Sequence, residues 1–276
     1  MPRQPNILIF DSGVGGLTIG RELLQKRQNC QLFFAADNAA FPYGVKSDEF
    51  LAERLLSQME QLIPQTNADI VVIACNTAST LVLDALRKRF DAIFVGVVPA
   101  IKPAVAISKT GTIALLATPA TIKRSYTQQL IQKHAPNSQV ILFGSHTLVE
   151  IAETWLSENK LNDQALNYEV HNLLSHPNAE HIDTAVLACT HFPLLKKAFH
   201  EALSSSLKRE VNLVDSGEAI ARRVESLLIR DQNIEAAIPE TKAQPSQNEG
   251  EVTLIFSAPI EGKWINRYKD YLRRPL

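Results

Sequence analysis

Residues 70–77, IVVIACNT, and residues 184–191, TAVLACTH, are the two stretches that decide the fold of this chain. Each begins with a run of apolar residues that does not alternate with polar ones, and each ends in Ala-Cys followed by two polar residues. Unbroken apolar runs of about four to eight residues are typical of strands that are buried on both faces, as in parallel sheets. The two stretches therefore predict two buried strands, each with a cysteine at its carboxyl end.

An earlier motif precedes each of these stretches in the same order. Residues 7–13, ILIFDSG, come before the first cysteine, and residues 113–119, IALLATP, come before the second. Each motif reads as a buried strand that ends in a small polar turn. The matched order predicts an internal repeat. We therefore expect two similar α/β domains related by a pseudo-twofold axis, with the active site at their interface.

Buried strands alternate with helical segments along the rest of the chain. Residues 50–63 carry apolar side chains on one face of a helix, and Ser47 is placed to cap that helix. The alternation predicts an α/β fold with mostly parallel sheets. The apolar runs predict strands at residues 7–10, 31–35, 70–74, 93–97, 112–116, 139–143, 184–188, 212–214 and 252–256.

The end of the chain sets the expected domain boundaries. The last predicted strand and the residues after it are expected to return to the first half, which makes the first domain discontinuous. We expect this domain to contain residues 1–97 plus 213–276, and the second domain to contain residues 98–212. Residues 231–250 are polar and include prolines, so they predict an exposed loop.

The composition is that of a globular protein without a strong charge bias. The 276 residues are 45% hydrophobic and 21% charged, and the formal net charge is −1. This balance gives no signal for binding nucleic acid or an anionic membrane. The first apolar run is too short for a secretory signal or a membrane span. We therefore expect a cytoplasmic protein.

The only cysteines are Cys30, Cys75 and Cys189. A low, odd number argues against a disulfide framework and is typical of a reducing cytoplasm. The chain has no CxxC pair and no histidine-rich cluster, so we expect no metal site. Cys30 precedes a predicted strand and is expected to be structural. This leaves Cys75 and Cys189 as candidate reactive thiols.

Both candidate thiols are predicted to lie just before a helix. The candidate caps are Asn76 or Thr77 after the first cysteine, and Thr190 or His191, with Pro193 in the first turn, after the second. A thiol near a helix N-terminus is biased toward thiolate. Free backbone N–H groups at the same place can hold a carboxylate. Such an environment suits an amino-acid substrate beside a reactive sulfur.

Two thiols that face one carbon from opposite sides suit a racemase. Racemisation at Cα removes a proton from one face and delivers a proton to the other, so it needs an acid/base group on each side. One sulfur starts as thiolate and the other as thiol, and their roles reverse with the hand of the substrate. Asp11 and His191 are the candidate neighbours that tune these thiols or relay protons.

Two other functions fit parts of the sequence. Residues 13–16, GVGG, follow a predicted strand as in a dinucleotide-binding domain, but Thr18 replaces the third small residue of that pattern. Cys189 and His191 could instead be the nucleophile and base of an amidase or acyl transferase, which leaves Cys75 unexplained. A trapped acyl-enzyme would favour the amidase. Exchange of the substrate α-proton with deuterated water would favour the racemase.

Five motifs follow one another along the chain. They are DSGVGGL at residues 11–17, FPYG at 41–44, ACNTAS at 74–79, ACTHFPL at 188–194 and VDS at 214–216. In this order they resemble the glutamate racemase family, within the aspartate/glutamate racemase superfamily. The resemblance implies conversion of L-glutamate to D-glutamate for peptidoglycan synthesis, without pyridoxal phosphate or metal. It also implies that Cys75 deprotonates D-glutamate and that Cys189 deprotonates L-glutamate.

The same resemblance implies further site residues and partners. Asp37 and Glu153 match acidic positions that assist the reaction. Aspartate racemases share the two-cysteine plan, so aspartate stays an alternative substrate here. A homodimer of unspecified arrangement is expected. Some relatives need a muramyl-peptide precursor as activator, and the resemblance leaves open whether this chain needs one. The implied substrate contacts are Asp11, Ser12, Tyr43, Gly44, Asn76, Thr77, Thr118, Thr121, Thr190 and His191.

Overall fold

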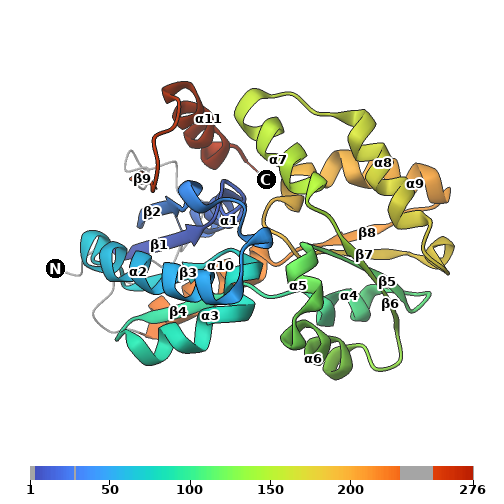
Figure 1. Cartoon of the computed structure of the whole chain (residues 1–276), viewed down its shortest axis with the longest axis horizontal. Helices are drawn as coiled ribbons and strands as arrows, with labels where there is room; N and C mark the ends of the chain where they lie inside the picture. The colour runs from blue at the N-terminus through green and yellow to red at the C-terminus, as the bar shows by residue number, and fades with distance from the viewer. Residues whose placement is uncertain (1–3, 28, 231–250, 276) are drawn as a thin grey trace, which may run out of the picture.

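The computed structural model describes residues 4–27, 29–230 and 251–275. These residues form two lobes that lie side by side, each built around one sheet (Figure 1). Both sheets are parallel throughout, with helices on both faces, so the expected α/β fold is confirmed. The loop predicted at residues 231–250 lies outside the described residues.

The two sheets have the same strand order. The first is β4-β3-β1-β2-β9 and the second is β6-β5-β7-β8. Strands β1, β2, β3 and β4 correspond in turn to β5, β6, β7 and β8, and the second order read backwards matches the first apart from the added β9. The predicted repeat is therefore confirmed. All nine predicted strands are present, with ends within one residue of the expected ones. Their bounds are β1 Asn6–Asp11, β2 Gln31–Ala36, β3 Ile70–Ile73, β4 Ile93–Gly96, β5 Thr112–Ala117, β6 Gln139–Gly144, β7 Thr184–Leu187, β8 Asn212–Val214 and β9 Val252–Phe256.

Helices cover both faces of the first sheet because its strands carry apolar side chains on both sides. Ile7 and Ile9 of β1 pack toward one helix layer, and Leu8 and Phe10 pack toward the other. As predicted, Ser47 caps α2, since its Oγ accepts the backbone N–H of Phe50 at 3.2 Å. The first layer is α1 Leu17–Lys26, α10 Gly217–Arg230 and α11 Gly262–Arg273, and the second is α2 Asp48–Thr66 and α3 Asn76–Arg89.

The second lobe repeats this three-layer plan. Alternate residues of β5 face the two helix layers, with Ile113 and Leu115 on one side and Ala114 and Leu116 on the other. No helix in the described part of the chain is long and apolar enough to cross a bilayer. One layer contains α4 Ile101–Ile107, α5 Pro119–Lys123 and α6 Ser125–His134, and the other contains α7 Thr147–Glu158, α8 Asp163–Leu174 and α9 Lys196–Leu207.

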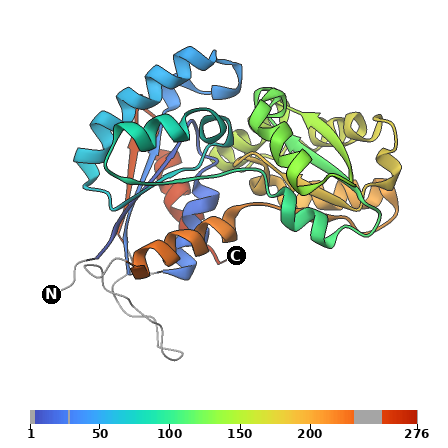
Figure 2. The same ribbon diagram turned by 90° about the horizontal axis from the view of Figure 1, so that it is seen from below.

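The chain passes between the lobes twice, after β4 and after β8 (Figure 2). The two crossings are tied together, because Ser216 Oγ donates a hydrogen bond of 2.8 Å to the carbonyl of Val98. The predicted boundary between residues 212 and 213 falls inside β8, all of which pairs with β7. Strand pairing keeps these residues in the second lobe, and we therefore place the boundary after Val214.

Candidate active site

The carboxyl ends of strands from both lobes meet where the lobes face each other. β1 ends at Asp11, β3 leads into Cys75, and β7 leads into Cys189. Between them lies a cavity of about 20 Å³, which we call the active cavity. It has room for about one water molecule, so lobes or side chains must move before an amino acid binds. Its wall consists of Asp11, Ser12, Phe41, Pro42, Tyr43, Gly44, Cys75, Asn76, Thr77, Thr118, His146, Val149, Ala188, Cys189, Thr190 and His191.

Most of the residues that the sequence predicts for the site lie in this wall. Both cysteines face it, one from each lobe. Three predicted residues, Thr121, Asp37 and Glu153, lie behind the wall instead, and each forms a hydrogen bond with a wall residue. The structure therefore brings the predicted set together in two layers.

Cys75 occupies the N-cap position of α3, so the prediction that Asn76 or Thr77 caps this helix is wrong. The strand ends one residue earlier than expected, which moves the sulfur onto the helix terminus itself. Its Sγ lies 4.0 Å from Ser12 Oγ. Burial raises the pKa of the Cys75 thiol, the charge of Asp11 raises it further, and the backbone N–H of Ala78 offsets part of this. These neighbours favour the thiol form of Cys75.

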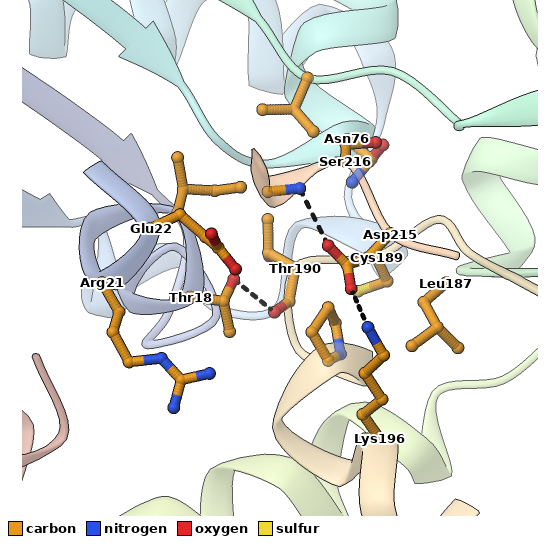
Figure 3. Close-up of a pocket in the computed structure, with 14 residues that line it drawn as sticks. Thr18, Arg21, Glu22, Asn76, Leu187, Cys189, Thr190, Lys196, Asp215 and Ser216 are labelled. Carbon is orange, nitrogen blue, oxygen red and sulfur yellow. Dashed lines mark hydrogen bonds and ion pairs between the residues drawn. The ribbon is translucent and has the colours of Figure 1, made fainter. Parts of the chain in front are cut away.

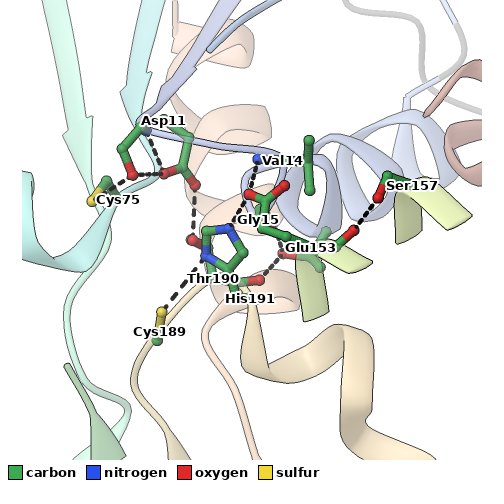
Figure 4. A network of polar contacts seen from close by, with 11 residues as sticks. Asp11, Val14, Gly15, Cys75, Glu153, Ser157, Cys189, Thr190 and His191 are labelled. Atoms are coloured by element: carbon green, nitrogen blue, oxygen red, sulfur yellow. Dashed lines mark hydrogen bonds and ion pairs between the residues drawn. The ribbon is translucent and has the colours of Figure 1, made fainter. Parts of the chain in front are cut away.

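Cys189 has a different neighbourhood (Figure 4). Its Sγ lies 3.8 Å from His191 Nδ1, and His191 Nε2 lies 2.7 Å from Glu153 Oε1. Burial alone lowers the pKa of His191, but the hydrogen bonds and charges of Cys189 and Glu153 outweigh it and raise that pKa well above its usual value. This shift favours the imidazolium form of His191 beside the sulfur.

The polar residues after Cys189 do not cap a helix with their side chains as predicted. His191 stands at the N-cap of a short 3₁₀ helix, Phe192–Leu195, but makes no side-chain cap hydrogen bond. Its ring nitrogens contact Cys189 and Glu153 instead, and the hydroxyl of Thr190 donates a hydrogen bond to the other lobe. Pro193 does lie in the first turn, as expected.

Asp11 joins the two lobes at the floor of the active cavity. It is fully buried, and Thr190 Oγ1 from the second lobe donates to its Oδ2 at 2.8 Å. The backbone N–H of Ser12 donates to Oδ1 at 2.6 Å. Burial raises the pKa of Asp11, while His191 and the two hydrogen bonds partly offset this rise. Asp11 thus couples the environments of the two thiols.

The GVGG stretch lies at the lobe interface. A Cβ on Gly13 would clash with Glu153 Oε1, and a Cβ on Gly15 would lie 2.5 Å from Thr190 Oγ1. The N–H of Val14 donates to Glu153 Oε1 at 3.0 Å, across the lobes. The glycines therefore allow close approach of the second lobe, and this role replaces the phosphate-binding one.

Three threonines close the cavity on another side. The hydroxyls of Thr77, Thr118 and Thr121 lie 3.0–3.2 Å from one another, and they come from both lobes. Each hydroxyl can donate or accept. The cluster therefore offers hydroxyl donors to a carboxylate.

Asp37 does not reach the active cavity. Its carboxylate accepts hydrogen bonds from Arg54 at 2.6 and 2.9 Å and from Tyr43 Oη at 2.7 Å. Burial raises the pKa of Asp37, but the hydrogen bonds from Arg54, Ser257 and Tyr43 outweigh it and lower that pKa. From behind the wall, Asp37 fixes the position of the wall residue Tyr43.

The sequence analysis missed four wall residues besides Ala188, namely Phe41, Pro42, His146 and Val149. His146 lies just before α7, and Val149 lies on this helix three residues later. Glu153 follows Val149 by about one turn. Residues at this spacing share a helix face. Counting back from the predicted Glu153 in steps of one helical turn could therefore have identified Val149 and His146 from the sequence.

A second and larger cavity, of about 270 Å³, lies on the other side of Cys189 and Thr190 (Figure 3). Lys196 Nζ reaches Asp215 Oδ2 across it at 2.9 Å. This places the VDS motif at the second crossing between the lobes, outside the wall of the active cavity. Within the described residues, no group of three or more His, Cys, Asp or Glu side chains is arranged to hold a metal ion.

Comparison with known proteins identifies the class to which this fold and site belong. The family described as Asp/Glu/Hydantoin racemase matches residues 20–224. The match covers well over half of the chain, and the chain therefore belongs to the Asp/Glu/hydantoin racemase family.

Within this family the relatives are glutamate racemases. The chain is 46% identical over 245 residues to that of Yersinia pseudotuberculosis serotype O:3 (strain YPIII), covering 88% of this chain and 82% of the relative. It is 48% identical over 238 residues to that of Aliivibrio fischeri, covering 86% of both. The crystal structure of Escherichia coli glutamate racemase with L-glutamate and the activator UDP-MurNAc-Ala has a TM-score of 0.82 and 38% identity, covering 97% of this chain and 95% of that chain. The chain is an amino-acid racemase of the glutamate racemase group.

Proposed function

We propose that this enzyme interconverts L- and D-glutamate by two-base proton transfer, with Cys75 and Cys189 as the two bases. The observation that carries the proposal is the placement of the two thiols at equivalent strand ends of two repeated lobes, in the wall of one cavity. A substrate Cα between them would meet a sulfur on each face.

The neighbours of the thiols support a definite starting state. We assign the starting thiolate to Cys189, whose Sγ lies 3.8 Å from His191 Nδ1, and the starting thiol to Cys75, whose pKa is raised by burial and by the charge of Asp11. In that state Cys189 removes the α-proton of L-glutamate. Cys75 then donates its proton to the opposite face, so one C–H bond breaks, one forms, and the thiolate moves to Cys75. The reverse reaction starts from that second state.

The other site residues serve these transfers without exchanging the α-proton. Glu153 stabilises the imidazolium of His191, and Asp11 with Thr190 ties the two thiol environments together. A carboxylate of the substrate would be held by Asn76, the threonine hydroxyls and the free N–H groups at the start of α3. Developing negative charge on Cα is spread into the substrate carboxylate, and these donors stabilise it there.

Cys189, His191 and Glu153 also match the geometry of a nucleophile, a base and an orienting acid. This arrangement alone would fit the amidase alternative. It gives no task to Cys75, and the relatives named above are racemases. For the same reason glutamate is the proposed substrate and aspartate the alternative.

We further propose that D-glutamate made by this enzyme serves peptidoglycan synthesis in the cytoplasm, and that the enzyme is a homodimer.

The test is conversion of L-glutamate to D-glutamate by the purified protein, followed by circular dichroism, with no cofactor added. The assay is run with and without UDP-MurNAc-Ala, the activator present with the E. coli enzyme. L-aspartate and L-glutamine are the comparison substrates. Absence of conversion of either glutamate enantiomer under both conditions, or a requirement for pyridoxal phosphate, would overturn the proposal.

A further inference from the structure

The active cavity contains an imidazole that the proton transfers do not use. His146 immediately precedes α7, seven residues before Glu153, so both lie on the same side of that helix. Its side chain is half-buried and lines the cavity wall. Among the described residues, the ring has no hydrogen-bonding or ion-pair partner.

The charges of the wall show what this imidazole can do. Glutamate brings two carboxylates, yet the wall contains no lysine or arginine. Its cationic candidates are the two histidines, His146 and His191. His191 is already engaged by Glu153 at 2.7 Å and by Cys189 at 3.8 Å. His146 is the wall imidazole that stays available to a substrate anion.

A series of contacts along the cavity wall relates the position of His146 to that of Cys75. Thr77 follows the reactive Cys75 by two residues, and its hydroxyl lies 3.0 Å from Thr118 Oγ1. Thr118 and His146 both border Gly44: a Cβ placed on Gly44 would lie 3.2 Å from Thr118 Cβ and 3.0 Å from His146 Cε1. Along this series of contacts, Thr77, Thr118 and Gly44 separate His146 from Cys75.

We propose that His146 binds the side-chain carboxylate of the substrate and thereby selects a dicarboxylic amino acid. The inference rests on the proposed function, because the position of Cα between the thiols sets the direction of the side chain. An imidazole can donate an N–H hydrogen bond to a carboxylate in either protonation state. A charge-assisted bond of this kind discriminates against the neutral amide of glutamine.

Calorimetric binding tests the inference independently of turnover. DL-glutamate and DL-glutamine are titrated into the wild-type chain and into the His146→Gln and His146→Asn variants. Racemic ligands are used because racemisation leaves their composition unchanged. The control is His171→Gln, on an exposed face of α8. We expect both His146 variants to bind glutamate about tenfold more weakly, with glutamine affinity and the control unchanged.

Each outcome decides the matter. Loss of glutamate affinity alone supports a bond to the side-chain carboxylate. Equal loss for glutamate and glutamine, or no loss for either, overturns it. A wild-type protein that binds glutamate but does not racemise it overturns the proposed function instead, and the binding comparison still decides the role of His146.

Discussion

The ends of β3 and β7 are equivalent in the two lobes, but their cysteines have opposite surroundings. Cys75 follows β3 and faces a buried carboxyl group, Asp11, which raises its pKa. Cys189 follows β7 and faces a buried imidazolium, His191, at 3.8 Å. The repeated scaffold therefore sets where the thiols lie, and the neighbours set which one carries the proton. In the proposed two-base mechanism one thiol is deprotonated while the other carries a proton, and this difference favours one of the two starting states.

The neighbours differ because they come from different places in the chain. Asp11 belongs to the first lobe and contacts Thr190 of the second. Glu153 belongs to α7 of the second lobe and contacts the backbone of Val14 in the first. Each thiol environment is thus completed across the interface. The groups that shift the pKa values of Cys75 and His191 nevertheless lie in the same lobe as these residues, Asp11 beside Cys75 and Glu153 beside His191, and the contacts between the lobes hold them in place.

Removing either thiol is expected to have the largest effect. Cys75→Ala and Cys189→Ala should each lower racemisation by at least about 10³-fold, because each removes one of the two proton-transfer groups. Because the two enantiomers have equal free energies, the rates of racemisation from L- and from D-glutamate fall together in either variant. The roles of the two thiols are instead distinguished by exchange of the α-proton of each enantiomer with deuterated water. Proton NMR should show that Cys75→Ala exchanges the α-proton of L-glutamate only, and that Cys189→Ala exchanges that of D-glutamate only.

The third cysteine provides the control for that experiment. Cys30 is fully buried outside the active cavity, and burial raises the pKa of its thiol to about 11. Cys30→Ala should keep most of the activity. Substantial racemisation by either of the other two variants would refute the two-base mechanism.

The Gly15→Ala substitution is expected to separate the lobes. The new Cβ would lie 2.5 Å from Thr190 Oγ1 and 2.6 Å from His191 Nδ1, so both thiol environments must shift. Displacements of about 1 Å in an active site cost about 100-fold in rate, and we expect a loss of that size in kcat/KM. Gly262→Ala, with no heavy atom within 4 Å of its Cβ, is the matched control. Equal activity of the two variants would contradict this account of the interface.

Glu153→Gln should lower kcat/KM by about tenfold at neutral pH, equally in both directions, because it disturbs the His191 and Cys189 side of the site. Glu153 helps to raise the pKa of His191. The imidazolium persists below that pKa and is lost as the pH rises through it. Without Glu153 the pKa of His191 falls, so the alkaline limb of the kcat/KM profile should move to lower pH. A pH–rate profile that keeps its alkaline limb would show that His191 is not the titrating group.

The smallest effect is expected at the outer rim between the lobes. Arg124 of the second lobe donates to both carboxylate oxygens of Asp48 in the first, at 2.7 and 2.8 Å. The Asp48 side chain is 57% exposed, and exposed pairs contribute little. Arg124→Gln should raise KM by less than about threefold and leave kcat unchanged. A large loss would mean that this pair, and not the buried contacts, holds the lobes in register.

Much of the fold could be predicted from local pattern. Buried parallel strands are apolar on both faces, so their positions were predicted to within a residue. Ser47 was predicted correctly as a cap because its hydrogen bond lies within one helical turn. The cap at Asn76 was wrong because β3 ends one residue earlier than expected and Cys75 takes the N-cap position. Thr190 does not cap a helix because its hydroxyl donates to Asp11 of the other lobe. The boundary at residue 213 was wrong because strand pairing, which is non-local, assigns β8.

The site shows the same division between local and distant information. The sequence by itself determined the two thiols, the repeat and the polar residues that follow each strand, because these are written in contiguous motifs. Only the tertiary structure decided that Asp37 anchors Tyr43, that His146 lines the cavity, and that one thiol faces a carboxyl group and the other an imidazolium. The physical reason is that burial and charge act through space, so a protonation state depends on neighbours that the chain order does not reveal.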